Sequence, residues 1–99
     1  MKILILVVSL LSLNSLYAKN TSVDVSKIYG KIQYVDSFPD YKVEVVDAFA
    51  DLRVQEVSAF GNTAGKWEIV TSFPDYKIQK VTAFGDFKIK YVNAFPGVE

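Results

Sequence analysis

The hexapeptide SFPDYK occupies residues 37–42 and returns unchanged at residues 72–77. Both copies belong to a longer unit: a basic residue, an apolar residue, two variable positions, Val, one variable position, Ser or Ala, Phe, then usually Pro or Gly and often Asp. Six copies of this unit, mostly 11 residues apart, fill residues 30–97. Their phenylalanines are Phe38, Phe49, Phe60, Phe73, Phe84 and Phe95.

The six units form two halves. The segment GNTAGK, residues 61–66, adds two residues between the third and fourth units, and the flanking halves, 30–62 and 65–97, are identical at 16 of 33 aligned positions. Internal duplication explains this match. Each half is small, so we expect that neither buries its apolar face without the other.

The repeat unit predicts strands, although its spacing alone favours a helix. Apolar residues recur with a period near 3.67, which is typical of a helix in a right-handed supercoil. However, Pro or Gly follows Phe in five of the six units, and both residues destabilise a helix. Segments such as KVEVVDAF, residues 42–49, are rich in residues that suit strands. We therefore predict an all-β single small domain with a turn after each Phe.

Two further expectations concern the shape of each unit. A spacing of three between apolar residues, where a flat strand requires two, predicts a bulge or bend in every unit. Phenylalanines at six equivalent positions are expected to fill the common centre of the domain.

The N-terminus has the layout of a secretory signal peptide. A basic Lys2 precedes an apolar run from Ile3 to Leu13, and a short polar stretch ends at Ala18. The alternative, a retained membrane anchor, is disfavoured because the run is shorter than the roughly 20 residues of a spanning helix. We therefore expect an exported protein, periplasmic or secreted, whose mature form does not span the membrane. The predicted regions are a signal peptide (1–18), a polar N-terminal lead, either flexible or an edge segment (19–29), and the β-repeat domain (30–99).

Composition narrows the possible functions. Without Lys2 the chain keeps 10 Lys plus Arg against 11 Asp plus Glu, so it lacks the basic excess of a nucleic-acid binder. The sequence contains no Cys and no His, which excludes disulfides, His-based triads, thiol chemistry and His or Cys zinc sites. No catalytic, cofactor-binding or metal-binding residue is predicted, and the protein is not expected to be an enzyme.

The tandem Val-x-Ser/Ala-Phe-Pro/Gly-Asp units, interrupted by Gly-Lys-Trp at residues 65–67, resemble the 7(1) septoil knot family of small bacterial proteins. This resemblance implies an all-β chain that winds twice round one axis, with two interlaced halves and a knotted backbone. It brings no established catalytic activity, and therefore no site residues. Interlacing could replace the missing disulfides by slowing unfolding. The chain departs from the repeat pattern at Ala50, Asn62 and Gly97.

The charged positions of the repeat allow two interpretations each. A basic residue begins every unit, and the row could grip an anionic glycan or lipid. We favour a solvated face, because Asp stands two positions before four of these bases. The aspartates could also suggest calcium, but one carboxylate per turn is too few, so a turn role is preferred.

Trp67 is the one residue for which a ligand contact is considered. It stands where the other units have Ile or Val, and we expect it to pack at the seam between the halves. The alternative is a platform for a sugar ring, with Lys66 and Lys77 at the contact. Tyr34 and Tyr91 share a variable position with Val, Ile, Glu and Lys, which indicates an unselective rim.

These observations predict an exported, non-enzymatic β-repeat protein that serves as a stable structural or protein-interaction module. The alternative is a module that binds envelope glycan or another anionic ligand. The expected partner is accordingly an envelope protein or glycan.

Overall fold

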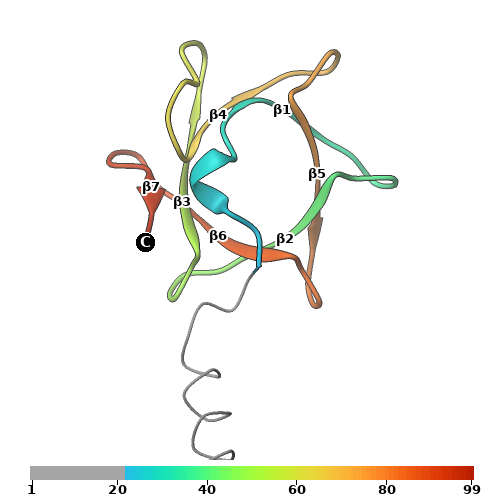
Figure 1. Ribbon diagram of the computed structural model, residues 1–99, viewed down its shortest axis with the longest axis vertical. Coiled ribbons are helices and arrows are strands. Elements are labelled where there is room, and N and C mark those ends of the chain that lie inside the picture. The colour runs from blue at the N-terminus through green and yellow to red at the C-terminus, as the bar shows by residue number, and fades with distance from the viewer. Residues whose placement is uncertain (1–21) are drawn as a thin grey trace, which may run out of the picture.

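The computed structural model describes residues 22–99 (Figure 1). The predicted signal peptide, residues 1–18, lies outside the described part. Within residues 22–99, no helix is long and apolar enough to cross a membrane. The elements are a 3₁₀ helix η1 (Val25–Lys27) and the strands β1 (Gly30–Tyr34), β2 (Tyr41–Val45), β3 (Leu52–Val57), β4 (Lys66–Ile69), β5 (Tyr76–Val81), β6 (Phe87–Tyr91) and β7 (Gly97–Val98).

Six strands form a closed parallel barrel. Their order is β4, β1, β5, β2, β6, β3, and β3 pairs again with β4 to complete the ring (Figure 1). Strands of the first half, β1 to β3, therefore alternate with strands of the second half, β4 to β6. The short β7 pairs antiparallel with β3. The predicted all-β domain with two interlaced halves is confirmed.

The register explains how loops of only a few residues join parallel strands, which usually need a connection of a dozen or more. Ile78 of β5 is the register partner of both Tyr34, at the end of β1, and Tyr41, at the start of β2. Because β2 begins at the level where β1 ends, the loop 35–40 only carries the chain across β5. Most of the loops cross one strand of the other half in this way.

The two extra residues between the halves fall in the loop 58–65, which joins β3 to β4. These strands are direct neighbours in the barrel, whereas β1 and β2, or β5 and β6, are separated by one strand. The step from β3 to β4 thus shifts the second circuit by one strand relative to the first. The second circuit then fills the gaps that the first leaves.

The core is a layer of one apolar residue per unit, at the position after the basic residue. All six are completely buried: Ile32, Val43, Val54, Trp67, Ile78 and Ile89. Inside each strand the inward positions alternate with period two, as in Leu52 and Val54 of β3. The valine three residues after each core residue is only half-buried. The apolar residues are three apart because the valine lies on the outer face of the chain. The spacing therefore does not indicate the bulge or bend that we predicted.

The segment before β1 plugs one end of the barrel. Val25 and Ile28 are 4% and 2% exposed and belong to the core cluster. The Asp24 carboxylate caps η1 by accepting a hydrogen bond from the Ser26 N–H at 3.2 Å. In its described part, the polar lead predicted for residues 19–29 contributes to the core and forms no strand at a sheet edge, because apolar residues stand between its polar ones (Figure 1).

Candidate functional site

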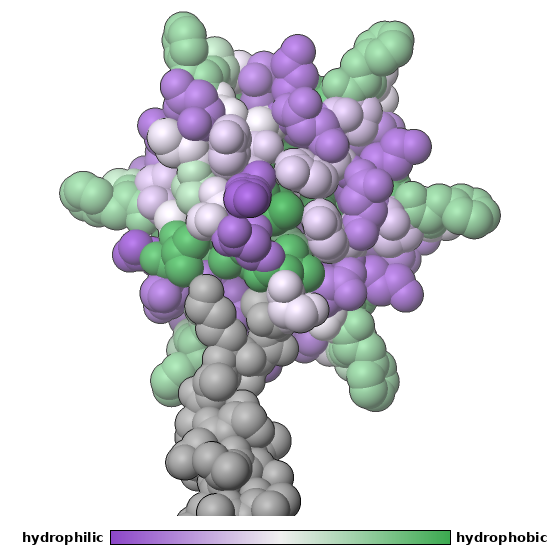
Figure 2. All heavy atoms as spheres, viewed as in Figure 1, coloured by the Kyte–Doolittle hydropathy of each residue, from purple (hydrophilic) through white to green (hydrophobic). Residues whose placement is uncertain are grey.

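The phenylalanines of the six units, called here the tip phenylalanines, are the most exposed large apolar residues of the described chain. Each lies in the left-handed backbone region, with φ between 52° and 60°. Their exposed fractions range from 83% to 95%, and apolar side chains project from the rim in all directions (Figure 2). The expectation that they fill the centre is wrong. The inward positions lie within the strands, whereas each Phe lies in a connection outside them. The tip phenylalanines are Phe38, Phe49, Phe60, Phe73, Phe84 and Phe95.

Carboxylates hold the loops onto the strands that they cross. The Asp of a loop accepts a hydrogen bond from the backbone N–H of a basic residue in the other half, and its own N–H donates to the carbonyl of that residue. The four N–H to carboxylate distances are 2.8 Å for Lys31 to Asp75, 2.7 Å for Lys42 to Asp86, 2.7 Å for Lys77 to Asp40 and 2.8 Å for Lys88 to Asp51. The aspartates thus have the turn role that we favoured.

Glutamine side chains add a second set of bonds between the halves. The amides of Gln33, Gln55 and Gln79 donate to the carbonyls of Thr71, Asn93 and Asp36, at 3.1, 3.1 and 2.9 Å. The loops that carry Phe38 and Phe73 are therefore hydrogen-bonded to the barrel on both sides of the Phe. These bonds fix the position of the two loops relative to the strands that they cross.

The end of the barrel opposite the plug contains a polar cluster. Tyr34 of β1 and Tyr91 of β6 come from strands on opposite sides of the ring, and their hydroxyl oxygens are 2.8 Å apart. The Tyr34 hydroxyl donates to the Glu56 carboxylate at 3.0 Å, so the Tyr91 hydroxyl is the donor between the two tyrosines. The Lys80 ammonium lies 4.4 Å from the centre of the Tyr34 ring. What the sequence indicated as an unselective rim is a hydrogen-bonded closure.

Burial is the main cause that raises the pKa of Tyr34, and its hydrogen bond to Tyr91 acts in the same direction. Burial also raises the pKa of Tyr91. Both hydroxyls therefore stay protonated at neutral pH and act as hydrogen-bond donors.

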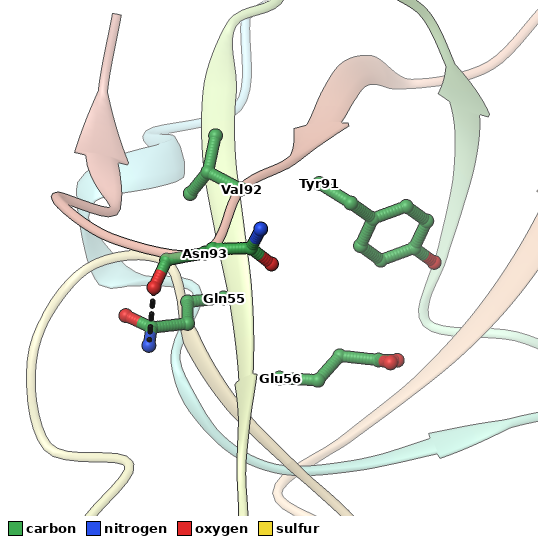
Figure 3. A pocket seen from close by; sticks show the side chains of 5 residues that line it. All are labelled: Gln55, Glu56, Tyr91, Val92 and Asn93. Atoms are coloured by element: carbon green, nitrogen blue, oxygen red, sulfur yellow. Dashed lines mark hydrogen bonds between the residues drawn. The ribbon is translucent and has the colours of Figure 1, made fainter.

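A shallow pocket of about 290 Å³ adjoins this cluster, at the point where β6 ends beside β3 (Figure 3). Its walls are mostly polar. Glu56 is its one carboxylate and is already bound to the Tyr34 hydroxyl. The Gln55 amide closes one side by donating to the Asn93 carbonyl. The lining residues are Gln55, Glu56, Tyr91, Val92 and Asn93.

Trp67 lies inside the barrel. It is completely buried, and its indole N–H donates to the carbonyl of Ile28 in the plug segment at 3.0 Å. The Tyr34 ring packs at a centroid distance of 6.4 Å. The favoured packing role is confirmed. The alternative of a sugar platform is wrong, because no face of the indole reaches solvent.

Lys66 and Lys77 do not form a site with Trp67. Lys66 begins β4 and Lys77 is the second residue of β5, and these two strands are separated by β1. Both positions alternate with inward residues, so the two lysines lie on the outer wall. Lys77 is exposed and Lys66 is partly buried. The structure therefore separates the three residues that the sequence grouped.

Comparison with known families agrees with this geometry. A family model for the 7(1) septoil knot domain matches residues 25–99. The chain belongs to the septoil knot family. The alternating strands of its two halves accord with the doubly wound, knotted backbone that the resemblance implied. The family match begins at Val25, so it includes the plug of the septoil knot barrel. No curated protein matches the chain.

Proposed function

We propose that this septoil knot protein is an exported, non-enzymatic module that binds another protein through its tip phenylalanines. The observation that carries the proposal is that all six are 83% to 95% exposed while their backbone is held at positive φ. Bulky residues with positive φ are outliers that occur mainly in tight turns or strained functional segments.

The tip phenylalanines oppose both stability and solubility. Left-handed backbone costs a residue with a Cβ about 1 kcal/mol or more, and Asn or Gly adopts it more readily. A side chain that is at least 83% exposed contributes little to the core. A sequence under no other demand would use Asn or Gly at these six positions. Recognition of a partner supplies the missing reason for Phe, since aromatic residues are enriched in protein interfaces.

The arrangement of the tips favours attachment at several points. By strand order the tips run round the ring as Phe73, Phe38, Phe84, Phe49, Phe95 and Phe60. Because they point outward in all directions, one flat partner can meet only neighbouring tips (Figure 2). The ring is therefore suited to a partner that surrounds it or to several partner molecules at once, with avidity from repeated weak contacts.

The test compares three forms of residues 19–99 as bait for extracts of the native cell envelope. The first is wild type, and the second carries Asn at all six tips. The control carries Asn at the exposed residues two positions before the tips, namely Asp36, Asp47, Ser58, Thr71 and Thr82. We expect a partner to bind wild type and the control but not the tip variant. A partner that binds all three equally, or the absence of any saturable partner, contradicts the proposal.

Export is part of the proposal and is supported by the sequence of residues 1–18. Cell fractionation and mass determination of the mature N-terminus test it directly. A full-length chain that keeps Met1 in the cytoplasm contradicts export.

The alternative is a module that binds envelope glycan or another anionic ligand. With Trp67 buried, this alternative loses its aromatic platform and depends on the cations of the outer wall. One pair of these cations is unusual and leads to the following inference.

A further inference from the structure

The outer wall of the barrel carries cross-strand pairs that include a basic residue. In five of them the cation faces a Gln or Glu: Lys31 with Glu68, Gln33 with Lys77, Lys42 with Gln79, Glu44 with Lys88 and Gln55 with Lys66. The sixth places Arg53 of β3 opposite Lys90 of β6. Like charges directly opposite each other destabilise a sheet, so this pair is the exception on the wall.

Lys90 causes the exception. The position after the core residue holds Gln or Glu in the other five units, at Gln33, Glu44, Gln55, Glu68 and Gln79. Arg53 itself occupies the ordinary basic position of its unit. The sequence therefore departs from its own repeat at the one place where the change sets two cations side by side.

Arg53 is also incompletely bonded. Its Nε is the one buried side-chain nitrogen or oxygen without a hydrogen-bond partner among residues 22–99. The carboxylate nearest in sequence, on Asp51, accepts a hydrogen bond from the Lys88 N–H at 2.8 Å. The chain end runs along the same edge, where the Glu99 N–H donates to the Asp51 carbonyl at 3.2 Å. Within the described chain, no ion pair joins Arg53 or Lys90 to a carboxylate.

We propose that Arg53 and Lys90 form a binding site for a tetrahedral oxyanion such as phosphate. A guanidinium presents parallel N–H groups that match two oxygens of a phosphate, and an ammonium adds a point charge for a third. The anion removes the repulsion between the two cations and gives the terminal N–H groups of the Arg53 guanidinium an acceptor. The phosphate can be free or part of an anionic lipid headgroup, and the recognising chemistry is the same. The site does not depend on the tip phenylalanines.

The test titrates residues 19–99, which include the whole barrel, with inorganic phosphate at constant ionic strength. Backbone amide NMR shifts are followed, with chloride as the reference salt. We expect saturable shifts centred on Arg53 and Lys90. The variant Lys90→Gln restores the residue type of the other units and should weaken binding by about tenfold. The matched control Lys77→Gln removes a cation that faces Gln33 and should leave the affinity unchanged.

A second readout is stability. Without phosphate, Lys90→Gln should raise the urea midpoint, because it removes the like-charged pair. Phosphate should raise the midpoint of wild type more than that of Lys90→Gln at the same concentration. The comparison of the two midpoints with and without phosphate distinguishes stabilisation by a bound anion from a general effect of the changed charge.

A third arm identifies the source of the anion. Vesicles of phosphatidylglycerol and phosphatidylcholine are compared with vesicles of phosphatidylcholine alone. Binding that depends on Lys90 for the anionic vesicles only, with no response to inorganic phosphate, supports the site with a lipid headgroup as its ligand. A response to inorganic phosphate supports it with a free phosphate or phosphate ester. The proposal is overturned if neither probe binds in a Lys90-dependent manner, or if Lys77→Gln weakens binding as much as Lys90→Gln.

Discussion

Lys31 and Asp75 are bound to each other twice, although they belong to different halves of the chain. The Lys31 N–H donates to the Asp75 carboxylate at 2.8 Å, and the Asp75 N–H donates to the Lys31 carbonyl at 2.7 Å. The same pair of hydrogen bonds joins Asp40 to Lys77 and Asp51 to Lys88. The Asp of the repeat thus fastens four of the crossing loops to the backbone beneath them.

Replacement of Asp75 by Ala should therefore destabilise the barrel. The change leaves the Lys31 N–H without its carboxylate, and we expect a loss of about 1 kcal/mol in the free energy of unfolding because the site is open to solvent. Asp36→Ala is the control, since the loop bond at that residue uses its carbonyl and not its side chain. Urea denaturation of both variants measures the difference. Equal midpoints for the two variants would exclude the fastening role.

Replacement of a tip phenylalanine should not destabilise the barrel, in contrast to replacement of Asp75. Phe84 is 95% exposed at φ 60°, and Asn adopts this backbone with less strain. We expect Phe84→Asn to leave the free energy of unfolding unchanged or to raise it by up to about 1 kcal/mol. The buried Ile78 is the contrast, because Ile78→Ala should cost about 2 to 5 kcal/mol. A loss of more than about 1 kcal/mol in Phe84→Asn would show that the ring supports the fold.

The Tyr34 cluster should make the fold sensitive to alkali. Its raised pKa means that Tyr34 stays protonated in the folded protein above the ordinary tyrosine value near 10, while the unfolded chain ionises. The stabilisation is thus fully present below pH 10 and is lost as the pH rises beyond it. Stability against urea, measured from pH 8 to 12, should fall steeply above pH 10.

Tyr34→Phe provides the test of this cause. It should lower stability at pH 7 by about 1 kcal/mol, because it removes the bonds to Glu56 and Tyr91. The variant should also lose less stability than wild type as the pH rises above 10. Tyr29→Phe, at a residue that is 39% exposed, should do neither. An unchanged alkaline profile in Tyr34→Phe would assign the loss to another tyrosine.

The sequence predicted the strands and one core position in each unit correctly because both depend on local chemistry. A basic residue followed by Ile, Val or Trp marks the start of a strand and its inward side chain, and Ile32 and Trp67 obey this rule. The tip phenylalanines were misplaced because hydrophobicity alone assigns Phe to a core. A positive φ could not be predicted at these positions, because Phe rarely adopts this backbone conformation and its presence therefore does not indicate it.

The order of the strands lay beyond the residues themselves. Two halves that align without gaps fit side-by-side stacking as well as interlacing, and only the family resemblance implied the latter. In contrast, the Arg53 and Lys90 pair left a visible signal, since Lys90 breaks the Gln or Glu pattern of its position. The register that sets it opposite Arg53 was needed to interpret that signal.

Cutting the chain between Asn62 and Thr63 should unfold both products. Every strand of β1 to β3 pairs only with strands of the second half, and no two of β4 to β6 pair with each other. The fragments 19–62 and 63–99 are therefore each expected to show coil spectra by circular dichroism. Mixed at equal concentration, they should regain β-structure with second-order kinetics, since every sheet bond then forms between molecules.

The same fragments measure what interlacing contributes to the intact chain. In the uncut protein a chain end must pass back through the other circuit before the barrel can open, so unfolding in urea should be slower than in the two-fragment complex. Trp67, buried in the intact protein, reports both rates by its fluorescence. A fragment 19–62 that is a folded monomer with protected amides would contradict the interlaced architecture. Equal unfolding rates for the intact protein and the complex would contradict the expected slowing of unfolding by interlacing, but not the interlaced architecture itself.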